Sequence, residues 1–146
     1  MSWTELFAEI KPHNIRRGDI IALRTVITRD LEEAAIEGTS ADRSFALAYN
    51  AVLHVAIMVV ACSGYRVLRN QARHKIAFEA AELAIGSSIS TFVTYFDTCR
   101  RKQNLSDYGV GEELSDQEAQ DLRAKAHKFL DLVERWITSK YPSFAK

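Results

Sequence analysis

One long apolar segment constrains the fold of this chain more than any other feature. Between residues 45 and 62 nearly every side chain is apolar, and Asn50 and His54 interrupt the run. The segment lacks period-2 alternation, so its β-branched part at residues 55–60 is expected to be helical rather than a strand. A helix that is apolar on all sides belongs at the centre of a bundle. Asn50 and His54 also argue against a bilayer span, which needs about 20 apolar residues without such groups.

Shorter amphipathic segments flank this central helix. In the first, apolar residues from Trp3 to Ile10 step by three and four, and Asp19, Asp42 and Ser115 are expected to begin later helices. Further apolar stripes start near residues 76 and 89. Glycines at positions 38, 64, 86 and 109 follow helix-like segments, where a left-handed backbone ends a helix at little cost. No linker or repeat divides the 146 residues. We therefore expect one all-α domain over residues 1–146, a bundle of five to six helices.

Charge is balanced in total but sorted along the chain. Nineteen Lys and Arg residues match nineteen Asp and Glu residues, which disfavours nucleic-acid binding by bulk charge but leaves room for a local basic patch. Basic residues gather in a connector at residues 66–75, and again at residues 100–102 at the end of an expected helix. The second group has two interpretations. It complements the helix dipole, or it meets the connector to form one anion-binding surface.

Few residue patterns indicate a metal, a cofactor or a nucleophile. The four histidines are far apart, no phosphate-binding glycine loop is present, and we expect neither a metal site nor a cofactor. Cys99 precedes two arginines that would lower its pKa, but it shares a stripe with Phe92 and Phe96, which predicts a buried, inert thiol. The N-terminus shows no signal-peptide pattern, and a cytoplasmic location without membrane contact is expected.

Two polar groups stand on one face of the central helix. Asn50 and His54 are four residues apart. Buried groups of this kind need hydrogen-bond partners, so they belong either to a satisfied core network or to a ligand-binding cleft between helices.

The segment from residue 100 to 108 reads Arg-Arg-Lys-Gln-Asn-Leu-Ser-Asp-Tyr. Arginine, asparagine and tyrosine side chains that converge at a helix end can hold a phosphate through charge-assisted hydrogen bonds. The candidate ligand-binding residues are Arg100, Arg101, Lys102, Gln103, Asn104 and Tyr108, together with Asn50 and His54. Arg101, Asn104 and Tyr108 are also the candidates for a catalytic role.

Two stretches resemble a bacterial subfamily of HEPN domains. The first is Asp-Arg-Ser-Phe-Ala-Leu-Ala-Tyr-Asn-Ala at residues 42–51, running on to Gly-Tyr-Arg at 64–66, and the second is the Arg-Arg-Lys-Gln-Asn run followed by Tyr108. The resemblance covers roughly residues 18–137. It implies a small helical bundle that forms a homodimer through the motif-bearing helices. Many HEPN domains are metal-independent ribonucleases in toxin–antitoxin or defence systems. Others are inactive RNA-binding or protein-interaction modules, some of them beside a nucleotidyltransferase antitoxin.

The HEPN nuclease motif is an arginine, a polar residue, a short spacer and a histidine. Gln103 stands at the position of the arginine, Asn104 at that of the polar residue, and Tyr108 at that of the histidine. RNA cleavage needs a proton acceptor and a cation. Arg101 would supply the cation, but tyrosine, with a pKa near ~10, is a poor base at neutral pH. We therefore expect a non-catalytic module that binds RNA or nucleotide phosphate, a protein partner, or both. An active ribonuclease toxin and a purely structural interaction domain are the alternatives.

Overall fold

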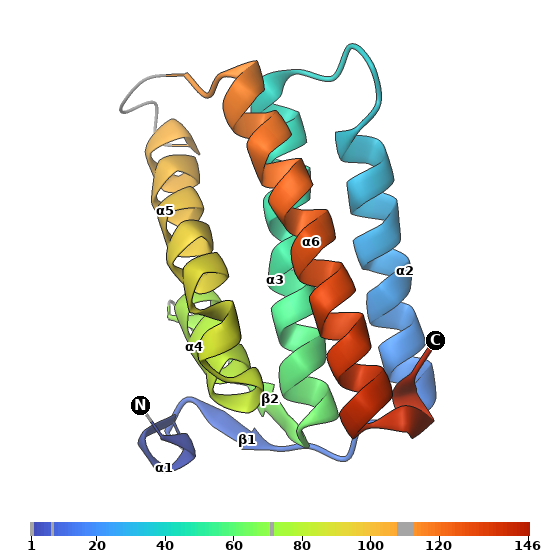
Figure 1. Ribbon diagram of the computed structural model, residues 1–146. Coiled ribbons are helices and arrows are strands. Elements are labelled where there is room, and N and C mark those ends of the chain that lie inside the picture. The colour runs from blue at the N-terminus through green and yellow to red at the C-terminus, as the bar shows by residue number, and fades with distance from the viewer. Residues whose placement is uncertain (1, 7, 71, 108–112) are drawn as a thin grey trace.

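The computed structural model describes residues 2–6, 8–70, 72–107 and 113–146, with the backbone alone at 105–107. Six α-helices, two short 3-10 helices and one two-stranded sheet make up this part of the chain (Figure 1). The elements in chain order are α1 (Trp3–Leu6), β1 (Ile10–Pro12), α2 (Arg17–Ala34), α3 (Ala41–Cys62), β2 (Tyr65–Val67), α4 (Arg73–Ile85), η1 (Ser87–Ile89), α5 (Ser90–Asp107), α6 (Asp116–Lys140) and η2 (Pro142–Phe144). The expected all-α bundle is confirmed.

Helix α3 is the centre of the bundle. Helices α4 and α5 lie on one side of it, α2 on the other, and α6 covers a third face (Figure 1). Val52, Ala56 and Met58 are completely buried, because each side of α3 meets another helix. The stretch at residues 55–60 is helical, as the lack of alternation predicted.

The length and composition of α3 would also suit a membrane span. Its most apolar window has a mean hydropathy of 2.1, and 72% of that window is buried inside the protein. Burial of this kind is typical of the core helix of a bundle, and the same composition is found in spanning helices. The cytoplasmic location expected from the sequence stays a prediction.

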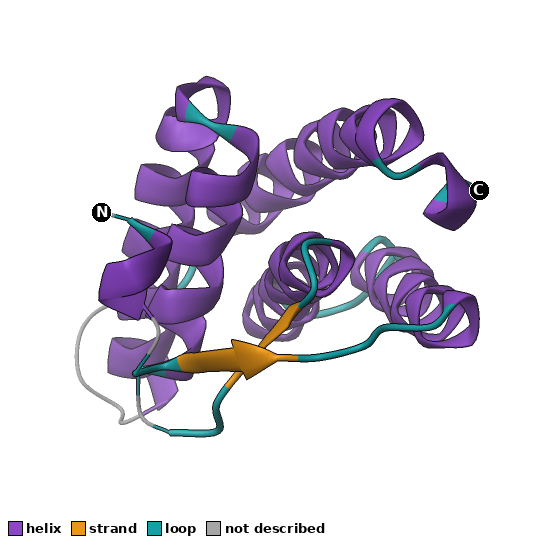
Figure 2. Ribbon diagram, turned by 90° about the horizontal axis from the view of Figure 1, so that it is seen from below, coloured by secondary structure: helices purple, strands orange, loops and turns teal. Residues whose placement is uncertain are grey.

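The first expected helix is shorter than predicted, and this is a correction. Helix α1 ends at Leu6, and Ile10 lies in strand β1, which pairs antiparallel with β2 and sets Ile10 opposite Val67. Ile10 takes an extended backbone because it pairs with Val67, a partner distant in sequence, and Pro12 disfavours a helical backbone at Lys11. Leu6 and Ile10 remain buried together against α4. Figure 2 shows the two strands lying across the end of the bundle that carries the N-terminus.

Two helix starts are displaced from the residues that the sequence indicated. Arg16, not Asp19, is the N-cap of α2, and the Asp19 carboxylate accepts a hydrogen bond of 3.0 Å from the Arg16 amide. Ser40, not Asp42, caps α3. In both cases the expected acidic residue lies in the first turn, where its charge complements the helix dipole.

Gly64 ends α3 as predicted. Its φ of +92° lies in the region that only glycine adopts without strain, and the chain turns there from α3 into β2. Gly38 and Gly86 also have positive φ, whereas the predicted break at Gly109 lies outside the described residues.

An aromatic cluster joins α4, α5 and α6. The Phe96 ring on α5 is fully buried and lies 5.6 Å from the ring of Phe78 on α4 and 5.1 Å from that of Phe129 on α6. Phe92 and Tyr95 complete the cluster at 6.0 and 5.7 Å from Phe96. These contacts hold the α4–α5 pair against the rest of the bundle.

We expect Phe96→Ala to lower the free energy of unfolding by about 3–5 kcal/mol, because it removes a buried ring and leaves a cavity between three helices. Chemical denaturation monitored by circular dichroism measures this loss. Phe144→Ala, at a half-buried position in η2, is the control and should cost clearly less. Equal losses would contradict the placement of Phe96 at the centre of the cluster.

Candidate functional site

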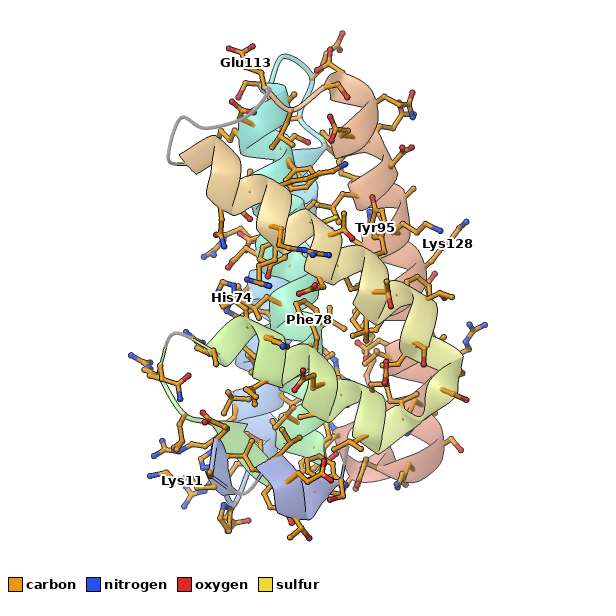
Figure 3. All side chains as sticks on the ribbon, turned by 90° about the vertical axis from the view of Figure 1, so that its left-hand side faces the viewer. Lys11, His74, Phe78, Tyr95, Glu113 and Lys128 are labelled. Carbon is orange, nitrogen blue, oxygen red and sulfur yellow. The ribbon has the colours of Figure 1, made fainter. Side chains whose placement is uncertain are left out.

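A polar pocket lies where the start of α4 faces the C-terminal half of α5. It has a volume of about 470 Å³, and we call it the basic pocket. Its lining residues are Arg69, Asn70, Arg73, His74, Arg100 and Asn104. Figure 3 shows His74 near the start of α4. The antiparallel packing of α4 against α5 thus brings part of the basic connector and part of the basic helix end to one place, as the second interpretation of the charge pattern requires.

The pocket carries a local excess of positive charge. Within the described part of the chain, Arg69 and Arg73 have no ion-pair partner, and no carboxylate lines the pocket. Arg100 pairs with Asp97 on its own helix at 3.0 Å. At the rim, the Asn70 amide donates a hydrogen bond of 2.6 Å to Glu9. Three guanidinium groups therefore line the pocket, and the two carboxylates that its lining residues contact are Asp97, through Arg100, and Glu9, through Asn70.

His74 is the residue that the sequence reasoning missed as a site residue. Its Nδ1 lies 3.2 Å from the buried phenol of Tyr49 on α3. Burial lowers the pKa of His74 below its usual value of about 6.5, and the charges of Arg73 and Arg100 lower it further. The imidazole is therefore neutral at pH 7. Burial also raises the pKa of Tyr49, so the phenol keeps its proton.

The predicted residues at the end of α5 divide into two groups. Arg100 and Asn104 lie one turn apart and both line the basic pocket. Arg101 is exposed on another face of α5, 3.4 Å from Asp97. Gln103 is half-buried and does not line the pocket, and the predicted site residue Tyr108 lies outside the described residues.

Lys102 links α5 to α6 through an ion pair. Its Nζ lies 2.8 Å from Glu118. This hydrogen bond raises the pKa of Lys102 and lowers that of Glu118. The Glu118 amide donates to the Ser115 hydroxyl at 3.0 Å, and the Ser115 amide donates back to the Glu118 carboxylate at 3.2 Å. Ser115 and Glu118 thus form a capping box at the helix start that the sequence indicated at Ser115, and Lys102 is held away from the pocket.

Asn50 and His54 follow the core-network interpretation. The Asn50 amide donates a hydrogen bond of 2.6 Å to Asp30, a carboxylate on α2 that is only 2% exposed. His54 Nδ1 donates to the backbone carbonyl of Asn50 at 2.8 Å. Neither residue lines the basic pocket, although the proximity of His54 contributes to the lowered pKa of His74.

The described residues show no other reactive centre. Cys62 and Cys99 are buried, and burial raises the pKa of both thiols to about 11, so Cys99 fits an inert core position. No group of three or more His, Cys, Asp or Glu side chains in the described ranges is placed to hold a metal ion. Comparisons with protein-family models, curated proteins and solved structures return no match for this chain.

We expect Asn50→Ala to lower the free energy of unfolding by about 1–3 kcal/mol, because it leaves the buried Asp30 carboxylate without its amide donor. Asn104→Ala is the matched control, since Asn104 is exposed and its loss should leave stability nearly unchanged. Urea denaturation of both variants checks this. Similar stability for the two would show that Asn50 has no structural role of this kind.

Proposed function

We propose that this protein binds a phosphate-bearing ligand, an RNA or a nucleotide, in the basic pocket between α4 and α5. The observation that carries the proposal is the gathering of Arg69, Arg73 and Arg100 with Asn104 around one pocket. Guanidinium groups form charge-assisted, often bidentate hydrogen bonds to phosphate. The N-terminal end of α4 adds partial positive charge on the same side.

The resemblance to HEPN domains supports the same conclusion from the sequence side. In that setting we propose a non-catalytic module that forms a homodimer and works in a toxin–antitoxin or defence system, with an antitoxin or nucleotidyltransferase as a further protein partner. Of the residues in the Arg-Arg-Lys-Gln-Asn run on α5, we assign Arg100 and Asn104 to the ligand. A purely structural interaction domain is the outcome to accept if neither RNA nor nucleotide binds at low salt.

Arg100→Ala should weaken the binding of a short single-stranded RNA, since it removes a phosphate contact in the pocket. The slope of log K against log salt should become shallower by about 0.7 for that contact. Fluorescence anisotropy over a series of salt concentrations measures both effects.

Arg101→Ala is the matched control, because it removes the same charge from the neighbouring residue outside the pocket. It should change the affinity and the slope less than Arg100→Ala does. If the two variants behave alike, the ligand does not lie in the basic pocket.

Metal-independent RNA cleavage is the second candidate function, and His74 is the observation that favours it. Tyr108 replaces the motif histidine, but the structure places a neutral imidazole beside Arg100. A neutral imidazole can accept the proton of a ribose 2′-hydroxyl, and a guanidinium can stabilise the charge that develops on the phosphate.

His74→Gln separates the two candidates. In the binding module, a bound phosphodiester raises the pKa of His74 above its lowered value in the free protein, so RNA affinity should increase as the pH falls toward the pKa of His74 in the complex. This increase should vanish in His74→Gln and persist in His127→Gln, which changes an exposed histidine on α6. Neither the protein nor its variants should cleave RNA. Cleavage in the presence of chelator that His74→Gln alone abolishes would establish the ribonuclease instead.

A further inference from the structure

A second pocket adjoins the basic pocket on the side of the two-stranded sheet, and we call it the sheet pocket. It has a volume of about 420 Å³. Its lining residues are Ile57, Arg66, Val67, Leu68, Arg69 and Arg73. Since Arg69 and Arg73 line both pockets, the two are contiguous and share a wall of two guanidinium groups.

The chemistry of the two pockets differs. The basic pocket is lined by charged and polar side chains. The sheet pocket also has aliphatic lining, because α3 contributes Ile57 and the chain around β2 contributes Val67 and Leu68. All three aliphatic side chains are only partly buried, so they offer apolar surface to a ligand. Arginine at the edge of such a surface can stack on a flat aromatic ring. A planar heterocycle fits this combination better than a second phosphate does.

The charges on the two-stranded sheet indicate where a further anionic group of the ligand would lie. Strand pairing sets Lys11 directly opposite Arg66, and both side chains are exposed on the outer face of the sheet. Two like charges in directly opposed positions destabilise a strand pair. An anionic group bound beside them would offset that repulsion. Figure 3 shows Lys11 at the end of the molecule that carries the two strands.

We propose that the sheet pocket is a nucleobase subsite. The base of a nucleotide packs on Ile57, Val67 and Leu68, and its phosphate lies in the basic pocket between Arg73 and Arg100. This inference rests on the proposed function, because it takes the phosphate of that ligand as its anchor. Arg66 lines the pocket beside the base, and Lys11 lies where the next phosphate of a nucleotide chain would follow. The chemistry shared by a free nucleotide and by a chain is the unit of a base with its phosphate.

The test compares ligands of increasing size in titrations followed by NMR. The probes are inorganic phosphate, ribose 5-phosphate, AMP, and a short oligoadenylate. AMP should bind at least about 10-fold more tightly than ribose 5-phosphate, a gain that corresponds to about 1.4 kcal/mol from the base alone. The oligoadenylate should bind more tightly than AMP if the natural ligand is a chain, and no more tightly if it is a free nucleotide.

Two variants locate the base. Ile57→Ala should remove most of the difference between AMP and ribose 5-phosphate while leaving phosphate affinity unchanged. Ile21→Ala, which truncates an isoleucine on α2 that is 50% exposed, is its matched control and should change none of the affinities. Arg66→Ala is the second variant, because Arg66 is exposed and lines the sheet pocket but not the basic pocket. It should weaken the binding of AMP and of oligoadenylate more than the binding of phosphate. Arg135→Ala on α6 is its control and should weaken neither.

The outcomes separate this inference from the proposed function. If phosphate and ribose 5-phosphate bind and AMP binds no more tightly, the basic pocket stands and the base subsite is wrong. If AMP binds more tightly but both Ile57→Ala and Arg66→Ala leave that gain intact, the base lies elsewhere and the inference is again wrong. If none of the probes binds, the proposed function itself fails.

Discussion

The burial of α3 on all its sides is the constraint on which the rest of the structure depends. An apolar helix of 22 residues must be covered by other elements, and α2, α6 and the α4–α5 pair share that task. The cover consists of amphipathic helices whose outer faces keep the charged residues. Because α4 and α5 pack antiparallel beside α3, the start of one helix lies next to the C-terminal half of the other. The basic pocket is a consequence of that pairing.

The polar groups of α3 show how a nearly apolar core contacts the candidate site. Asn50 fixes α3 to α2 through Asp30, whereas Tyr49 reaches the other way and contacts His74 at the start of α4. The first contact satisfies one oxygen of the buried Asp30 carboxylate, whose other oxygen pairs with Arg29. The second orients an imidazole whose neighbours are arginines. Neighbouring residues of one helix thus serve stability on one side and the candidate site on the other.

Most of the helical framework could be predicted from the sequence, because hydrophobic period and capping residues are local signals. The capping box at Ser115 and the burial of Cys99 follow from such signals. The strand at Ile10 could not be predicted in the same way, since its partner Val67 is distant in sequence. Likewise, the sorting of charge along the chain indicated two basic segments able to form one surface, but it could not distinguish Arg100 from Arg101. That distinction depends on which face of α5 meets α4. His74 was counted as one more basic residue, and only the packing against Tyr49 and Arg100 marks it as a site residue.

We propose that the start of α4 and the end of α5 form one binding surface for phosphate. The most direct test is an NMR titration of the isotope-labelled protein with a single-stranded RNA at low salt. We expect the largest amide and side-chain shifts on residues 69, 70, 72–74 and 100–104, and we expect the His74 ring signals to move with them. Shifts centred on α2 and α6, with the residues around His74 unchanged, would contradict it.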